Sequence, residues 1–76
     1  MNCSTQQLLS KRELEILHLV SNEYTIKEIA AQLFISAHTV ISHRQNIQSK
    51  LDVKNTAGMI RRAFELNFLS LSNHKN

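Results

Sequence analysis

The 76-residue chain contains no proline, no tryptophan and a single glycine. Because proline and glycine interrupt helices and form tight turns, their scarcity predicts an all-α chain with short connections. The lone cysteine, Cys3, excludes a disulfide framework within the chain and a zinc site built from several cysteines. No apolar run is long enough to span a membrane, and no signal peptide opens the sequence. We therefore expect one small helical domain in a reducing cytoplasm, without a cofactor, a metal site or a membrane partner.

The basic side chains are concentrated in the second half of the chain. Residues 1–35 contain three basic and four acidic side chains, whereas residues 36–76 contain six basic and two acidic ones. The second half thus carries a net charge of +4, larger than the +3 of the whole chain. This asymmetry favours a polyanionic partner only mildly, since many basic surfaces serve merely to keep a protein in solution.

Three short motifs predict where helices begin. Ser10-Lys-Arg-Glu13 and Thr25-Ile-Lys-Glu28 have the S/T-x-x-E form of a capping box. In that motif the hydroxyl accepts from the backbone N–H three residues on, and the carboxylate accepts from the backbone N–H of the first residue. Ser36 is placed to cap a third helix. Glu13 also lies on the apolar side of its helix, which favours capping or an internal ion pair over catalysis.

The spacing of apolar residues predicts four helices, each with one inward-facing stripe. The expected helices cover residues 11–21, 26–33, 37–51 and 56–66. The expected core residues are Ile16, Leu17, Val20, Ile26, Ile29, Ala30, Leu33, Val40, Ile47, Leu51, Met59, Ile60, Ala63 and Phe64, with Ile35 from the link before the third helix.

The connections and the chain ends carry simpler signals. Asn22 or Glu23 is expected to end the first helix, and of the two Asn22 is expected to take the left-handed conformation. Asn67 is expected to take the same conformation after the fourth helix. The helical domain is expected to cover residues 9–69, between a flexible N-terminus at 1–8 and a flexible tail at 70–76.

The third expected helix carries a row of polar, uncharged or weakly basic side chains opposite its apolar stripe: His38, Ser42, Gln45, Asn46 and Ser49. A merely solvated helix face usually carries Glu and Lys instead. Two short helices, a tight link and a longer polar-faced helix describe a helix-turn-helix, whose second helix enters the major groove of DNA. Amide, hydroxyl and imidazole groups match the donors and acceptors of base edges. We therefore favour base recognition over the alternative reading, an ordinary solvated face.

One combination of segments spans nearly the whole chain, roughly from Leu9 to Leu69: "LSKRELEILHLV", "TIKEIAAQLFIS", "HTVISHRQNIQSKLDV" and "AFELNFL". It resembles the LuxR-type helix-turn-helix, also called the GerE or FixJ type. The matching features are Glu13, the Lys27-Glu28-Ile29-Ala30 run, Ser36, Thr39-Val40, His43, Asn46-Ile47 and Lys50-Leu51. The resemblance implies a four-helix domain that regulates transcription, and dimers that use the fourth helix to occupy two half-sites on DNA.

The resemblance also implies roles for individual residues. The base-reading positions fall on Ile41, Ser42 and Gln45, and the polar row adds His38. The positions that contact the DNA backbone fall on Thr25, Lys27, Thr39 and Lys50, and we add His43 and Asn46 to this group. On the outer face of the fourth helix, the expected dimer contacts are Gly58, Arg62 and Glu65.

The chain departs from the family pattern at three positions. Glu23 stands where the family usually has glycine, which suggests that the turn after the first helix is made differently, through Asn22. Ile41 stands where lysine is frequent and offers an apolar contact suited to a thymine methyl group. Thr56 stands where arginine is frequent. The preferred DNA sequence of the family therefore cannot be transferred to this chain.

Other functions remain open at this stage. His38 and His43 are five residues apart, which separates them around a helix, whereas helical zinc pairs are four apart. Arg44 faces inward, where it can snorkel or pair with an acid. The sequence has no nucleophile–base set, no phosphate-binding loop and no carboxylate pair, so we expect no enzyme.

The alternatives to a LuxR-type regulator are a promoter-reading sigma-factor domain and a helical protein-interaction module. The expected partners are double-stranded DNA, a second copy of the chain and RNA polymerase.

Overall fold

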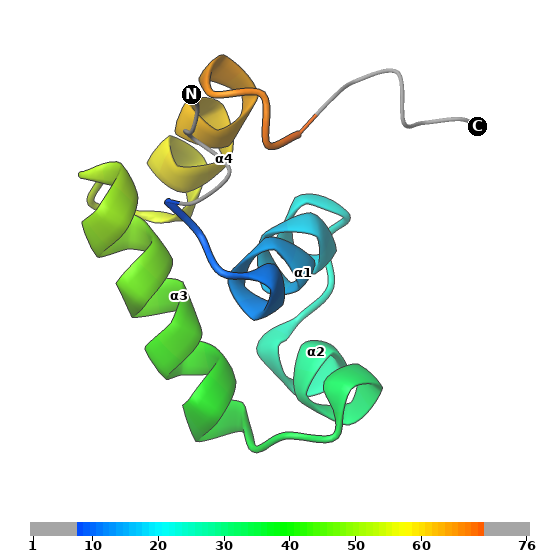
Figure 1. Cartoon of the computed structure of the whole chain (residues 1–76). Coiled ribbons are helices and arrows are strands. Elements are labelled where there is room, and N and C mark those ends of the chain that lie inside the picture. Colours follow the sequence, from blue (N-terminus) through cyan, green and yellow to red (C-terminus); the bar gives the residue numbers. More distant parts are fainter. Residues whose placement is uncertain (1–7, 70–76) are drawn as a thin grey trace.

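The computed structural model describes residues 8–69, which form four helices and contain no strand. The helices are α1 (Lys11–Ser21), α2 (Ile26–Leu33), α3 (Ala37–Leu51) and α4 (Thr56–Glu65) (Figure 1). The first three have the bounds predicted from the sequence, and α4 ends one residue earlier than expected because Leu66 is its C-cap. The all-α, four-helix prediction is confirmed. Of the flexible ends predicted at 1–8 and 70–76, all but Leu8 lie outside the described residues.

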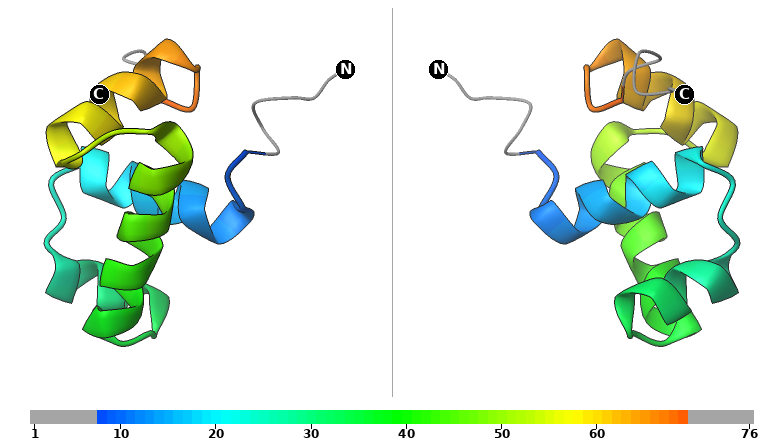
Figure 2. Two further views of the ribbon diagram at one scale, coloured as in Figure 1. Left: turned by 90° about the vertical axis from the view of Figure 1, so that its left-hand side faces the viewer. Right: turned by 90° about the vertical axis from the view of Figure 1, so that its right-hand side faces the viewer.

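The longest helix, α3, is the centre of the arrangement, since each of the other three helices packs against it. In Figures 1 and 2, α2 lies beside the N-terminal half of α3, and α4 lies at its C-terminal end. Helix α1 packs against both α2 and α3. One side of α3 is therefore covered by the rest of the domain, and the opposite side is left open.

The helices begin where the capping motifs predicted. In the first box, the Ser10 N–H donates to Glu13 Oε1 at 2.8 Å and the Glu13 N–H donates to Ser10 Oγ at 3.1 Å. The second box repeats these two bonds between Thr25 and Glu28 at 2.8 and 3.1 Å. Ser36 Oγ accepts from the backbone N–H of Thr39 at 3.0 Å. Each cap satisfies backbone donors that have no partner within the helix.

The core lies where the four apolar stripes meet. Its buried side chains are Leu9, Ile16, Leu17, Ile29, Val40, Ile47, Leu51, Met59, Ala63, Phe68 and Leu69. The other expected core residues surround this cluster and are only half-buried: Val20, Ile26, Ala30, Leu33, Ile35, Ile60 and Phe64. The periodicity thus identified the correct face of every helix.

All four helices end in the same backbone motif. A left-handed residue follows within two positions of each helix end: Glu23 (φ 69°), Phe34 (φ 59°), Asp52 (φ 59°) and Asn67 (φ 67°). The N–H of the next residue then donates to the carbonyl oxygen five residues back, for the pairs Tyr24–Leu19 (3.1 Å), Ile35–Ala30 (3.0 Å), Val53–Gln48 (3.0 Å) and Phe68–Ala63 (2.8 Å). This is the longer hydrogen bond of a Schellman motif, in which the left-handed residue is usually glycine. In this chain, residues with a Cβ take all four positions.

The expectation that Asn22 takes the left-handed conformation is wrong, whereas the same expectation for Asn67 is confirmed. Asn22 has φ −96° and ψ 17°, and its backbone N–H still donates to the His18 carbonyl oxygen at 3.2 Å. Its side-chain Nδ2 donates to the same oxygen at 3.0 Å. Because both bonds hold Asn22 against the last turn of α1, the left-handed position falls one residue later, on Glu23.

Candidate nucleic-acid interface

The open side of α3 carries the four predicted base-reading residues. His38 and Gln45 are exposed, and Ile41 and Ser42 are half-buried. At about 100° per residue, these four positions fall within one third of the helix circumference. The buried residues Val40, Ile47 and Leu51 occupy the opposite side. The fold therefore brings the predicted base-reading side chains together on one uncovered face.

A second row of predicted DNA contacts runs along the flank of α3. Thr39, His43, Asn46 and Lys50 are spaced four, three and four residues apart, which aligns them in one stripe beside the polar face. Thr39 Oγ1 lies 2.9 Å from Ser36 Oγ, so the two hydroxyls share a hydrogen bond at the start of the helix. His43 is half-buried, whereas Asn46 and Lys50 are exposed.

The remaining predicted backbone contacts lie at the start of α2, where Thr25 is the N-cap and Lys27 belongs to the first turn. Thr25 and Lys27 are both exposed. The Thr25 hydroxyl accepts from the Glu28 N–H, which leaves its own O–H as a donor. Within residues 8–69, Lys27 forms no ion pair, so its charge is available to an external anion. The N-terminus of a helix adds a partial positive charge that favours phosphate.

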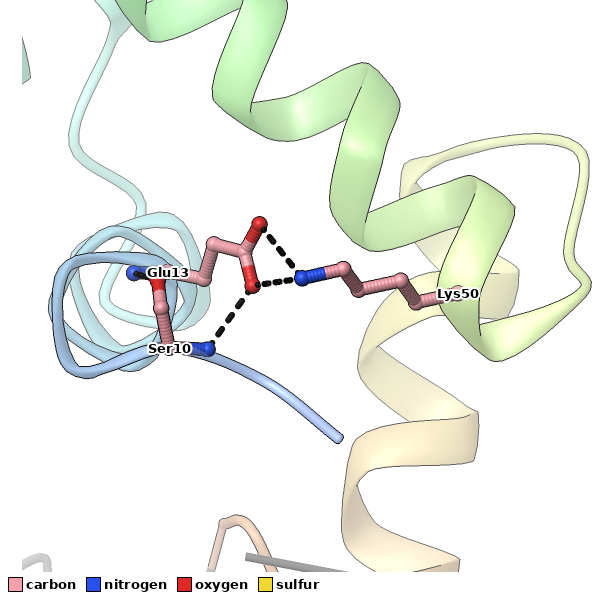
Figure 3. Close-up of polar contacts among 3 residues, drawn as sticks. All are labelled: Ser10, Glu13 and Lys50. Carbon is pink, nitrogen blue, oxygen red and sulfur yellow. Dashed lines mark hydrogen bonds and ion pairs between the residues drawn. The ribbon is translucent and has the colours of Figure 1, made fainter. Parts of the chain in front are cut away.

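Lys50 has a different environment, because its ammonium group reaches α1 (Figure 3). Lys50 Nζ donates to Glu13 Oε1 at 2.8 Å and to Glu13 Oε2 at 3.1 Å. Glu13 is only 5% exposed, and its Oε1 also accepts from the Ser10 N–H. Burial raises the pKa of the Glu13 carboxyl, but the hydrogen bonds from Lys50 and Ser10 and the charge of Lys50 outweigh it, so the pKa lies below its ordinary value. Glu13 is therefore ionised at neutral pH.

This ion pair confirms that Glu13 has the capping and internal pairing role expected for it. Sequence reasoning did not find the partner, because Lys50 is 37 residues away and no local spacing relates the two. The pair joins the beginning of α1 to the last turn of α3. By contrast, Arg44 is half-buried and forms no ion pair within residues 8–69.

The predicted dimer residues of α4 differ in their exposure and in their contacts within the chain. Arg62 and Glu65 are exposed and lie one turn apart, with Arg62 Nη1 3.3 Å from Glu65 Oε1. Arg61 Nε approaches the other oxygen of Glu65 at 3.6 Å. Gly58 is half-buried, and a Cβ placed there would lie 3.3 Å from Val53 Cβ. The close approach of Val53 is thus one reason for glycine at this position.

Metal clusters, membrane spans and pockets are the other features that bear on a site in the described residues. Residues 8–69 contain no group of three His, Cys, Asp or Glu side chains that could hold a metal ion. None of their helices has the length and apolar character needed to cross a membrane. An open pocket of about 470 Å³ lies between α1 and the segment after α4, lined by Leu9, Lys11, Leu14, His18, Asn67 and Phe68. It includes none of the predicted DNA contacts.

Comparisons with known proteins identify the family of the chain. The model of the family described as "Bacterial regulatory proteins, luxR family" matches residues 7–63. The oxygen regulatory protein NreC of Staphylococcus haemolyticus is 43% identical over 63 residues, which is 83% of this chain and 29% of that protein. The NreC protein of Staphylococcus carnosus has the same identity and coverage. The chain thus spans less than a third of the length of these curated relatives.

Two solved structures share the fold. The transcription factor GerE superposes with a TM-score of 0.81 at 40% identity, over 86% of this chain and 97% of GerE. The response regulator ChrA, from a haem-sensing two-component system, superposes with a TM-score of 0.78 at 35% identity, over 91% of this chain and 33% of ChrA. The chain belongs to the luxR family of bacterial regulatory proteins and forms a GerE-type, DNA-binding helix-turn-helix domain of a transcription regulator.

Proposed function

We propose that this chain recognises a specific sequence in double-stranded DNA by placing α3 in the major groove. The observation that carries the proposal is the uncovered face of α3, which presents His38, Ile41, Ser42 and Gln45 together. Gln45 can form a bidentate pair with adenine, Ser42 can bond to several bases, and Ile41 can contact a thymine methyl group. These side chains bind and do not react, so the proposed function is non-enzymatic. The proposed site of action is the bacterial cytoplasm, where the DNA lies.

Contacts to the sugar-phosphate backbone are proposed for the residues that flank this face. They are Thr25 and Lys27 at the start of α2, and Thr39, His43 and Asn46 from α3, whereas Lys50 of the same stripe is paired with Glu13. Such contacts set the orientation of the domain on the duplex, whereas base contacts supply the sequence preference. Lys27 is the clearest candidate among them, because no acidic side chain within residues 8–69 forms an ion pair with its ammonium group.

We also propose that the chain acts as a dimer. One short recognition helix contacts only a few base pairs, which is too little to select a site from a genome of competing sequences. The exposed Arg62 and Glu65 of α4 offer charges of both signs, and a two-fold axis can pair each with its opposite in the second copy. Gly58 lies one turn earlier on the same helix. A contact this small associates weakly in solution and more firmly once both copies are on DNA.

The dimer proposal fixes the spacing of the binding site. The two recognition helices reach one face of the duplex when the half-site centres are about 10 base pairs apart, one helical turn. Sites selected from random DNA should therefore contain inverted repeats at that spacing. Inserting about five base pairs between the half-sites turns one half-site to the far face of the duplex and should abolish cooperative binding. Equal affinity for a single half-site and for the palindrome would refute the dimer.

The competing function is a protein-interaction module that does not bind DNA. A DNA-binding domain should be retained on immobilised duplex at low salt and released as salt rises, because phosphate contacts displace counterions. An interaction module shows no such salt-dependent retention. RNA polymerase is proposed only as a further partner of a DNA-bound regulator. Binding to core polymerase without dimers on free DNA would favour the sigma-factor alternative instead.

A further inference from the structure

The Glu13–Lys50 ion pair lies at the edge of the proposed DNA-binding surface. Lys50 is the last member of the flank stripe of α3, after Thr39, His43 and Asn46. Its side chain is 41% exposed, so it lies at the surface, but its ammonium group is directed to Glu13 of α1 (Figure 3). The most basic group of the stripe is thus already bound to an anion in the absence of DNA.

The geometry of the pair is that of a tightly held charge. Both carboxylate oxygens of Glu13 accept from Lys50 Nζ, at 2.8 and 3.1 Å. The ammonium group thus spans both oxygens of one carboxylate within the domain. The carboxylate is itself fixed, because Oε1 accepts from the Ser10 N–H and the side chain is only 6% exposed. Within residues 8–69, no cation other than Lys50 lies within ion-pair distance of Glu13.

Moving the ammonium group to a phosphate would leave this carboxylate buried without its counterion. Removing one partner of a buried ion pair costs free energy, because the other charge stays desolvated and no longer has a counterion. Lys27 faces no such cost, since it has no acidic partner within the described residues. The two lysines should therefore respond differently to the same DNA backbone.

We propose that Glu13 withholds Lys50 from the phosphates, so that Lys50 positions the end of α3 against α1 instead of adding a full backbone contact. Glu13 is thereby a positioning residue that limits how strongly the domain holds DNA of any sequence. This inference rests on the proposed DNA binding. It also assigns a function to a carboxylate that the base-reading face does not use.

The test is a double-variant cycle read by the salt dependence of DNA affinity. Affinity for one duplex is measured between 50 and 200 mM salt for the native chain, Glu13→Gln, Lys50→Met and the double variant. Each full phosphate contact contributes about 0.9 to the slope of log affinity against log salt. We expect Lys50→Met to lower the slope by about 0.9 per protomer in the Glu13→Gln background and by less than half of that in the native background. Lys27→Met is the matched control and should lower the slope by about 0.9 in both backgrounds.

Urea unfolding of each variant shows that the titrations are made on folded protein. As a second measurement, the ¹⁵N-lysine ammonium signals are followed while a duplex is added to the native chain. The Lys27 signal should move and the Lys50 signal should stay in place. Equal slope losses for Lys50→Met in the two backgrounds, no loss in either, or equal movement of both lysine signals would overturn the proposal. Absence of any salt-dependent binding by the native chain would instead remove the DNA-binding function on which it rests.

Discussion

Replacing Phe34 with glycine should stabilise the domain, although it removes a large apolar side chain. Phe34 ends α2 with φ 59° and ψ 43°, in the left-handed region. The Ile35 N–H donates to the Ala30 carbonyl oxygen at 3.0 Å, which closes the motif and holds Phe34 in that conformation. The Phe34 side chain is 93% exposed, so it contributes almost nothing to the core.

The expected gain is the difference between two backbone effects. A residue with a Cβ costs roughly 1–2 kcal/mol in the left-handed region because of contact with the following carbonyl oxygen. Glycine avoids this contact but loses about 0.5–1 kcal/mol more conformational freedom on folding. The lost packing is small, since a ring this exposed buries only about 15 Å² and contributes roughly 0.4 kcal/mol. We expect Phe34→Gly to raise the free energy of unfolding by about 0.3–0.4 kcal/mol, or about 1–3 °C in Tm.

The assay is urea and thermal unfolding followed by circular dichroism, with Phe34→Ala as the matched control. Alanine removes the same ring but keeps the Cβ, so it should change stability by no more than about 0.5 kcal/mol and should not stabilise. The backbone argument therefore rests on the difference between the glycine and alanine variants. A glycine variant no more stable than the alanine variant would refute it.

Four further changes test the remaining features. Glu23→Gly relieves the same strain after α1 and should also raise Tm, whereas a lower Tm would mean that the φ of 69° costs nothing there. Ser36→Ala removes the cap of α3 and should cost about 1 kcal/mol in urea unfolding, an effect that Ser36→Asp should largely avoid. Because the folded pKa of Glu13 lies below its unfolded value of about 4.3, its pairing stabilises the fold above that pH and is lost as pH falls through the folded pKa. Glu13→Gln should therefore lose less stability than the native chain between pH 6 and pH 3, and equal losses would contradict the low pKa. Gln45→Ala should cost roughly 1–3 kcal/mol on the best DNA site and little on a scrambled duplex, so equal losses on both would exclude base reading.

The sequence predicted the helices well because their signals are local. A capping box needs only two residues three positions apart, and Ser10 with Glu13 and Thr25 with Glu28 form the bonds that this spacing implies. The apolar period needs only one helix at a time, so it identified the buried side of α3 through Val40 and Ile47 without knowledge of the neighbours. The same periodicity places the polar side chains of α3 on its opposite side, and this polar face indicated a helix-turn-helix.

The local signals were weaker where competing hydrogen bonds decide the conformation. Asn22 has the better intrinsic preference for the left-handed region, but Glu23 takes it, because Asn22 bonds twice to the His18 carbonyl oxygen. Propensity ranks residues one at a time and does not count these bonds. A chain with a single glycine must use other residues at its helix ends, and which residue it uses depends on the register of the last turn.

Three features follow only from the tertiary structure, because they join residues that are distant in the chain or depend on packing. The burial of Ile35 is partial, which its apolar character alone did not show. Gly58 packs against its own chain, because a Cβ at this position would lie 3.3 Å from Val53 Cβ. The partner of Glu13 is a lysine 37 residues away, brought within 2.8 Å by the packing of α1 against α3. From the sequence, Lys50 is one more cation on a DNA-binding helix. Only the fold places a buried carboxylate beside it, because ion pairing depends on distance in space and not on separation along the chain.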